Sequence, residues 1–172
     1  VGDGCSIGGV WKGFKECFTL GLIDRFPKIV GVQAEKSNPV TRAFEKRTYE
    51  FEYRVPETIA DSISVGIPRN GIKALNAVHE SGGYMIDVSD EEILTAMKVL
   101  AQKTGVFGEP AGVTSFAGII KMNELGLLKG DEKVVSIVSG SGLKDIKSAM
   151  KAAGKANLVE PNLTEVRKII NN

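Results

Sequence analysis

The opening residues, Val-Gly-Asp-Gly-Cys-Ser-Ile-Gly-Gly, place several glycines directly before an apolar helical pattern. Gly2, Gly4, Gly8 and Gly9 allow the backbone to approach a ligand closely. The amides that follow them would point outward from the positive end of the helix. This pattern predicts an anion-binding loop, most often for phosphate. A tight turn from a strand into a helix, with no ligand, explains the glycines equally well.

The loop differs from the two commonest nucleotide-binding loops. It is not followed by the Gly-Lys-Ser/Thr of a P-loop, and its Gly-x-Gly lacks a further glycine three residues on. The sequence therefore predicts a phosphate that belongs to neither ATP nor NAD. A mononucleotide-binding domain is a third possibility, because Glu35 lies at the end of an expected strand, where an acid could bind a ribose.

A second candidate site follows the apolar run that begins at Lys133 and ends at Ser139, in Ser-Gly-Ser-Gly. We expect this run to be a buried strand. Ligands of open α/β sheets bind beyond the carboxyl ends of the strands, where both glycine turns would lie. Glu109 precedes Pro110 at the start of an expected helix, where its carboxylate could stabilise the helix dipole or act in the site.

The segment 56–68 is rich in small hydroxyl residues and bounded by prolines, which suits a loop that lines a pocket. A plain connection with one helical turn fits it equally well. Hydrophobic periodicity and capping signals predict the regular elements around it. They are helices over 9–20, 39–44, 71–81, 89–105, from 110, 144–154 and 163–170, and strands over 28–34, 84–88 and 133–139.

The alternation of helices and short apolar strands predicts an α/β fold, a three-layer domain with a parallel sheet, formed by residues 1–172 as a single domain. Ile72, Leu75 and Val78 are expected on the inner face of the helix over 71–81. His79 lies at the edge of that face and is expected to be solvated or structural. The small residues after Pro110 would let their helix approach either a sheet or a bound ring closely.

Composition limits the possible partners. The chain has 172 residues, 42% of them hydrophobic, and its 22 basic and 21 acidic residues give a net charge of +1. We therefore expect neither nucleic acid nor an anionic membrane surface as a partner. Cys5, Cys17 and His79 cannot supply a usual four-ligand zinc site, so no metal is expected. The unpaired cysteines indicate a reduced, cytoplasmic setting.

In their order and spacing, the segments around these sites resemble the carboxyl-terminal half of the threonine synthases. These are pyridoxal-phosphate enzymes with the fold of the tryptophan synthase β-subunit, and this chain resembles part of their large domain. The resemblance covers most of the chain. It rests on Val-Gly-Asp-Gly-Cys-Ser at 1–6, Trp-Lys-Gly-Phe at 11–14, Pro-Glu-Thr-Ile-Ala-Asp at 56–61, Gly-Glu-Pro-Ala at 108–111 and Val-Ser-Gly-Ser-Gly-Leu-Lys-Asp at 138–145.

The resemblance implies pyridoxal 5'-phosphate as the cofactor and assigns roles by position. The cofactor phosphate would be held by Gly2, Asp3, Gly4, Cys5 and Ser6. The Ser139 hydroxyl would face the pyridine nitrogen and Glu109 would lie beside the cofactor, with Ala60, Asp61 and Ser62 on the substrate side. The whole enzyme would convert O-phosphohomoserine and water to threonine and phosphate, as a homodimer acting on a small amino-acid substrate.

This sequence departs from the family pattern in two places. It lacks the Ser-x-Lys stretch that carries the Schiff-base lysine, and nothing marks Lys12, Lys15 or Lys144 as activated. We therefore expect a fragment that needs the amino-terminal half of the same enzyme and is inactive alone. In the phosphate loop, Asp3 should turn outward or cap the helix. Cys5 is interpreted as either reactive or tightly packed.

Two further hypotheses remain beside this one. A serine or threonine dehydratase, or a β-replacing enzyme like cysteate synthase, would share the architecture, although Leu-Lys-Asp at 143–145 favours threonine synthase. A non-catalytic module that binds pyridoxal phosphate or another anion would keep the loop without the lysine. A Ser-x-Lys stretch upstream in the same reading frame would separate the enzymes from the module.

Overall fold

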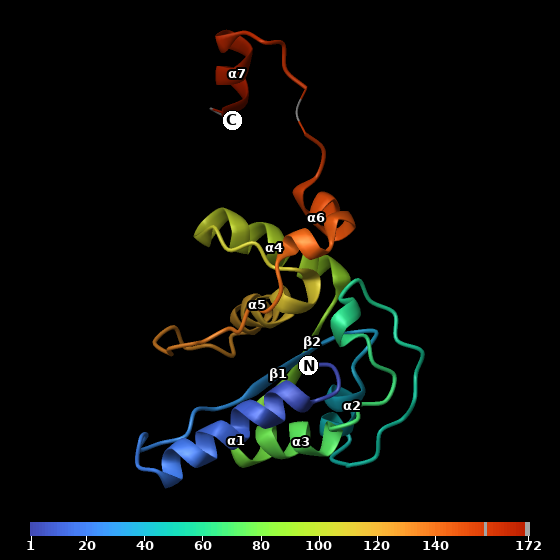
Figure 1. The fold of residues 1–172 in the computed structure, drawn as a ribbon, viewed down its shortest axis with the longest axis vertical. Coiled ribbons are helices and arrows are strands. Elements are labelled where there is room, and N and C mark those ends of the chain that lie inside the picture. The colour runs from blue at the N-terminus through green and yellow to red at the C-terminus, as the bar shows by residue number, and fades with distance from the viewer. Residues whose placement is uncertain (157, 171–172) are drawn as a thin grey trace.

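The computed structural model describes residues 1–156 and 158–170 (Figure 1). Helices alternate with two strands as far as α4, in line with that part of the hydrophobic pattern. In chain order the elements are α1 (Cys5–Thr19), β1 (Val30–Ala34), α2 (Pro39–Glu45), the 3₁₀ helix η1 (Asp61–Ile63), α3 (Gly71–Glu80), β2 (Tyr84–Val88), α4 (Asp90–Thr104), α5 (Pro110–Glu124), the 3₁₀ helix η2 (Gly142–Lys144), α6 (Ile146–Ala153) and α7 (Leu163–Ile170).

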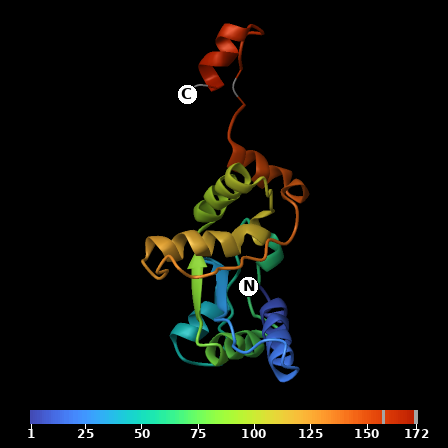
Figure 2. The ribbon, with the colours of Figure 1, turned by 90° about the vertical axis from the view of Figure 1, so that its left-hand side faces the viewer.

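The sheet within the described residues consists of β1 and β2 in parallel, with Val30 opposite Tyr84 and Ala34 opposite Val88. Figure 2 shows this sheet between α5 on one side and α1 and α3 on the other. The expected α/β fold with helices on both faces of a parallel sheet is therefore present. The sheet is narrower than the prediction, which also placed a strand over 133–139.

The segment 133–139 is not a strand in this structure, so that prediction is wrong. It has no regular secondary structure and no paired strand among the described residues, and Val135 is 88% exposed. A β-strand needs a neighbour for its amides and carbonyls, and β1 and β2 pair only with each other here. The segment instead runs along α5, where the hydroxyls of Ser115 and Ser136 lie 2.8 Å apart.

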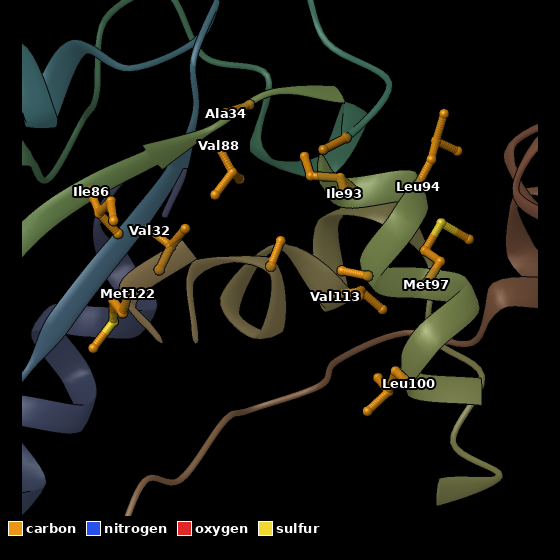
Figure 3. Packing of buried hydrophobic residues seen from close by; sticks show 13 residues of the cluster. Val32, Ala34, Ile86, Val88, Ile93, Leu94, Met97, Leu100, Val113 and Met122 are labelled. Carbon is orange, nitrogen blue, oxygen red and sulfur yellow. The ribbon is translucent and has the colours of Figure 1, made fainter. Parts of the chain in front are cut away.

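The larger hydrophobic core lies between the sheet and the helices α4 and α5 (Figure 3). Alternate strand residues point into it, as the period of two in a β-strand requires, among them Val32 and Ile86. A Cβ atom on Gly118 of α5 would come within 2.5 Å of Cγ2 of Val32. The small residues of α5 therefore let this helix lie directly against the sheet. The sheet was one of the two expected partners, the other being a bound ring.

The second core lies on the opposite face of the sheet, where α1 and α3 pack on Met85 with Trp11 and Leu75. Leu75 and Val78 are fully buried, as expected. Ile72 is 55% exposed, so its expected place on the same inner face is wrong.

The exposed His79 ring stacks on Phe44 with 5.0 Å between ring centroids, in agreement with a structural role. At the start of α4, the amide of Glu92 donates to the Ser89 hydroxyl at 3.1 Å. The amide of Ser89 donates to the Glu92 carboxylate at 2.5 Å. This is the capping box that the sequence predicts.

The first helix begins earlier than predicted. α1 starts at Cys5, so Gly8 and Gly9 lie inside the helix and only Gly2 and Gly4 belong to the loop. The amide of Gly8 donates to the carbonyl of Gly4 at 3.2 Å, which closes the first turn. The glycine at position 8 permits close helix packing, because a Cβ atom there would lie 3.0 Å from Cβ of Lys73 on α3. None of the described helices is long and apolar enough to cross a membrane.

Candidate functional site

The glycine loop leaves the sheet beside β1. The nitrogen of Val1 lies 2.5 Å from the carbonyl oxygen of Val32, and the side-chain amide of Gln33 donates to the carbonyl oxygen of Val1 at 2.9 Å. These contacts fix Val1 alongside the second half of β1. The loop that follows therefore opens near the carboxyl end of the strand, where ligands of parallel sheets bind.

Gly4 is the residue that turns the chain into α1. Its φ angle of 87° lies in the left-handed region, and a Cβ atom would lie 2.5 Å from the carbonyl oxygen of Asn70. Both constraints exclude a side chain at this position. Gly4 therefore lets the amino terminus of α1 approach the segment before α3 closely.

The Asp3 carboxylate binds the segment before α3. One carboxylate oxygen accepts from the backbone amide of Arg69 at 3.1 Å. The backbone carbonyl oxygen of Asp3 accepts from the backbone amide of Asn70 at 2.7 Å. Its side chain does not cap α1. Of the two expected orientations, the capping one is therefore absent. The side-chain amide of Asn70 also donates to the exposed Cys5 sulfur at 2.9 Å, so this thiol has a polar neighbour.

The amides at the start of α1 have no acceptor among the residues that the structure describes. Within residues 1–156 and 158–170, none of the backbone N–H groups from Gly2 to Ile7 donates to a protein atom. Cys5 and Ser6 are exposed in the first turn of the helix. Unpaired amides at a helix amino terminus carry partial positive charge and can hold a phosphate group. The residues expected to bind a cofactor phosphate therefore fit that group chemically.

The expected substrate-side residues lie next to this loop. A Cβ atom on Gly2 would come within 3.1 Å of Cα of Ile63, so η1 packs directly on the loop. Ala60 is fully buried. Asp61 and Ser62 are exposed, and the Ser62 hydroxyl donates to the Asp61 carboxylate at 3.1 Å. This segment is a connection with one helical turn, as one of its two interpretations predicts, and it packs beside the opening loop.

Glu109 and the second glycine turn form one cluster at the start of α5. Glu109 is 6% exposed, its amide donates to the carbonyl of Gly140 at 3.1 Å, and its carboxylate lies 3.3 Å from Nζ of Lys144. Ser139 is exposed, and its carbonyl oxygen lies 1.8 Å from the place a Cβ atom on Gly112 would occupy. Gly112 is thus required for the turn to approach α5 so closely.

The structure links the two turns through intermediate elements. The opening loop touches η1, η1 packs on α5, and α5 carries the Ser139 turn along its first residues. Among the described residues no hydrogen bond joins Ser139 directly to the opening loop. Three neighbours of the site were not found from the sequence: Gln33, Arg69 and Asn70. Only Gln33 carries a signal, because it is a polar residue in an apolar strand and must find partners when buried.

The lysines near the two turns are engaged in ion pairs at the surface. Lys12 pairs with Glu16 and Lys15 with Glu80, while Lys144 pairs with the Glu109 carboxylate. Their side chains are about half exposed or more, at 70%, 49% and 62% in that order. Within the described part of the chain, no group of three His, Cys, Asp or Glu side chains could hold a metal ion.

Comparison with known proteins identifies the family. The family model described as "Pyridoxal-phosphate dependent enzyme" matches residues 1–140. The chain belongs to this family. Its members use pyridoxal phosphate, and a loop of unpaired amides suited to phosphate is consistent with that membership.

Curated relatives of this pyridoxal-phosphate family member include several threonine synthases. The chain is 43% identical over 171 residues to the threonine synthase of Methanocaldococcus jannaschii, which covers 99% of this chain and 42% of the relative. It is 39% identical to that of Methanosarcina acetivorans and 37% identical to that of Synechocystis, again over 42% of each. The expected resemblance to threonine synthases is confirmed. The chain spans less than half the length of these relatives.

Solved structures confirm the fold of the pyridoxal-phosphate family. The processed form of threonine deaminase isoform 2 from Solanum lycopersicum superposes with a TM-score of 0.71 at 24% identity, over 92% of this chain and 43% of that one. Maize serine racemase gives a TM-score of 0.66 at 20% identity, over 89% and 44%. At these identities the similarity concerns the fold alone.

Proposed function

We propose that this chain is the carboxyl-terminal portion of a pyridoxal-phosphate-dependent threonine synthase, which converts O-phosphohomoserine and water to threonine and phosphate. The similarity to three threonine synthases over 171 residues supports this reaction. The observation that carries the cofactor role is the row of unpaired amides from Gly2 to Ile7 at the start of α1.

The opening loop is proposed to hold the cofactor phosphate. The amides of Gly2 to Ser6 would donate to its oxygens, and the exposed Ser6 hydroxyl would add a donor. The Asp3 carboxylate would not repel the phosphate, because it is turned toward the amide of Arg69. The partial positive charge at the start of α1 would add to the attraction.

Ser139 is proposed to face the ring nitrogen of the cofactor. A hydroxyl can accept from or donate to this nitrogen, whereas an aspartate would keep it protonated. When bound, pyridoxal phosphate supplies an electron sink that stabilises a carbanion at the substrate. Glu109 lies next to the Ser139 turn. Its backbone N–H donates a hydrogen bond to the carbonyl of Gly140 and its carboxylate pairs with Lys144, and both contacts would support the turn.

Asp61 and Ser62 are proposed to lie on the substrate side, with Ala60 as the buried anchor of their segment. The neighbouring Thr58 hydroxyl donates to the Asp90 carboxylate at 2.6 Å, and the Ile59 amide donates to the same carboxylate at 3.2 Å. These bonds tie η1 to the start of α4. They would keep the two exposed side chains at a fixed place beside the loop, as substrate orientation requires.

The Schiff-base lysine is proposed to lie outside this chain, in an amino-terminal half of the same enzyme. The surface ion pairs of Lys12, Lys15 and Lys144 support this proposal, because a catalytic lysine is normally activated by desolvation or a cationic neighbour. This chain alone would then be inactive. The complete enzyme is proposed to be a cytoplasmic homodimer.

The experiment uses the complete gene product. Its absorption spectrum is recorded with pyridoxal phosphate before and after borohydride, and phosphate and threonine are measured after adding O-phosphohomoserine. We expect reduction to fix the cofactor to a lysine upstream of Val1 and both products to form in equal amounts. Conversion of serine or threonine to a keto acid, without threonine synthesis, would establish a dehydratase instead. Cofactor binding with neither reaction would establish a non-catalytic module.

A further inference from the structure

A cavity of about 360 Å³ lies beyond the end of β1, outside the site proposed for pyridoxal phosphate. We call it the Arg42 cavity. It is bounded by the segment after β1, the first turns of α2 and the excursion that returns toward η1. Its charged lining residues are Glu35, Lys36, Arg42, Arg54 and Glu57. The volume falls at the small end of the range for small-molecule sites, so a macromolecular partner is not the natural occupant.

Arg42 is a partly buried cation whose hydrogen-bonding capacity is only partly used. Its side chain is 11% exposed, and its Nη2 atom donates to the carbonyl oxygen of Glu52 at 2.9 Å. The Nε and Nη1 atoms have no hydrogen-bond partner among the described residues. A guanidinium has five N–H donors and stays charged, so several donors of Arg42 lack an acceptor in this arrangement.

The Glu52 carboxylate does not supply a hydrogen-bond acceptor to these Arg42 donors. An oxygen of Glu52 lies 3.7 Å from Nη1 of Arg42, beyond hydrogen-bond distance, and the other oxygen binds Nζ of Lys46 at 2.5 Å. Glu52 is also 58% exposed, so water screens it. Burial lowers the pKa of Arg42, the positive charge of Arg54 lowers it further, and Glu52 only partly opposes these effects.

The remaining charges of the cavity leave an excess of positive charge. Nζ of Lys36 lies 3.8 Å from the Glu57 carboxylate, and both side chains are mostly exposed, so these two largely offset each other. Arg42 and Arg54 then face Glu35 and the exposed Glu52, and Glu52 is shared with Lys46. Two guanidinium groups at one cavity are the arrangement with which proteins bind planar or tetrahedral oxyanions.

We propose that the Arg42 cavity binds a small oxyanion, the phosphate or carboxylate group of a small molecule, between Arg42 and Arg54. The proposal does not rest on the proposed function, because none of these residues belongs to the opening loop or the Ser139 turn. The bound anion neutralises Arg54 and offsets the charge of the Arg42 guanidinium, whose unpartnered Nε and Nη1 atoms are themselves buried from solvent. In the competing explanation, Arg42 only anchors the excursion through the Glu52 carbonyl, and the cavity holds solvent.

The test measures binding of inorganic phosphate by equilibrium dialysis, on the complete gene product saturated with pyridoxal phosphate, at constant ionic strength in chloride. We expect one phosphate per chain that depends on both arginines. Arg54→Gln removes an exposed side chain and should raise the Kd of phosphate about tenfold. Arg42→Lys keeps the charge, loses the planar fork and should also weaken binding. Arg25→Gln, an exposed arginine between α1 and β1, is the matched control and should change nothing.

Succinate is added as a competitor to distinguish a carboxylate from a phosphate ligand. Displacement of phosphate by succinate would assign a general oxyanion site, and its failure would assign a phosphate site. Circular dichroism and the melting temperature check that each variant is folded. The proposal is overturned if no phosphate binds, or if the folded Arg54→Gln and Arg42→Lys variants bind it as the wild type does. In the second case the phosphate lies elsewhere, and the proposed threonine synthase activity is unaffected.

Discussion

The side chain of Gln33 in β1 ties Val1 to the start of α2. It is fully buried, and its amide nitrogen donates to the carbonyl oxygen of Val1 at 2.9 Å. Its carbonyl oxygen accepts from the amides of Val40 and Thr41, each at 2.9 Å. One side chain therefore meets polar groups from the residue before the glycine loop and from the first turn of α2. Gln33 fixes where the opening loop leaves the sheet.

Replacing Gln33 by methionine should destabilise the fold and loosen the opening loop. The change keeps the volume but leaves two amides and one carbonyl buried without partners, which we expect to cost about 2 kcal/mol or more. Urea unfolding measures the change in stability, and titration with pyridoxal phosphate measures cofactor affinity. Gln102→Met, at an exposed position of α4, is the control. Equal stability of the two variants would contradict a fastening role for Gln33.

Gly4→Ala and Gly9→Ala should have opposite effects, although both lie near the start of α1. Alanine at position 4 must adopt a φ of 87° and meet the Asn70 carbonyl, which should cost about 2 kcal/mol. Gly9 lies within the helix with no atom within 4 Å of a new Cβ, so alanine there should stabilise by about 0.5 kcal/mol. Thermal unfolding compares the two. A loss for Gly9→Ala as large as for Gly4→Ala would refute this account.

Local signals in the sequence were sufficient to predict most of the helices and both strands of the sheet. The capping box at Ser89 and Glu92 fixes the start of α4, and Pro110 fixes the start of α5, because both act within one helical turn. The opening glycines predicted a helix start at Gly9, four residues later than the observed start at Cys5. Composition alone could not separate loop glycines from the helical Gly8, whose role depends on the approach of Lys73.

Non-local relationships explain what could not be predicted. The run 133–139 has the composition of a buried strand, but a strand exists only where another strand pairs with it, and none does here. In the same way, the sequence indicated the loop of Gly2 and Gly4 but not its neighbours Arg69 and Asn70. Those contacts join residues more than sixty positions apart, and no local pattern marks them.

Acid should weaken the contact between α1 and α3 through Glu80. Its carboxylate accepts from Nε1 of Trp11 at 2.7 Å and from Nζ of Lys15 at 2.9 Å, and these bonds lower the pKa of Glu80 below its ordinary value of 4.5. A depressed carboxyl pKa stabilises the fold above pH 4.5, and that contribution is lost as the pH falls through the folded value. Because the side chain is 45% exposed, we expect an effect below about 1 kcal/mol.

Glu80→Gln isolates this titration, because glutamine can still accept from Trp11 but carries no charge. The difference in unfolding free energy between wild type and variant should be present at pH 7 and shrink toward zero below pH 4. Urea unfolding at several pH values measures it. Glu124→Gln, exposed at the end of α5, serves as the control for the general effect of removing a carboxylate. A difference for Glu80→Gln that stays constant with pH would contradict the assignment.

Ser139→Ala should separate cofactor binding from catalysis in the complete enzyme. In the proposed site the phosphate is held by the amides of the opening loop, so pyridoxal phosphate should bind with little change in affinity. The lost hydroxyl would no longer bond the ring nitrogen, which should lower the rate of threonine formation about tenfold. Ser136→Ala removes a hydroxyl whose hydrogen bond among the described residues is to Ser115, and it should leave the rate unchanged. Unaltered turnover in Ser139→Ala would remove this residue from the site.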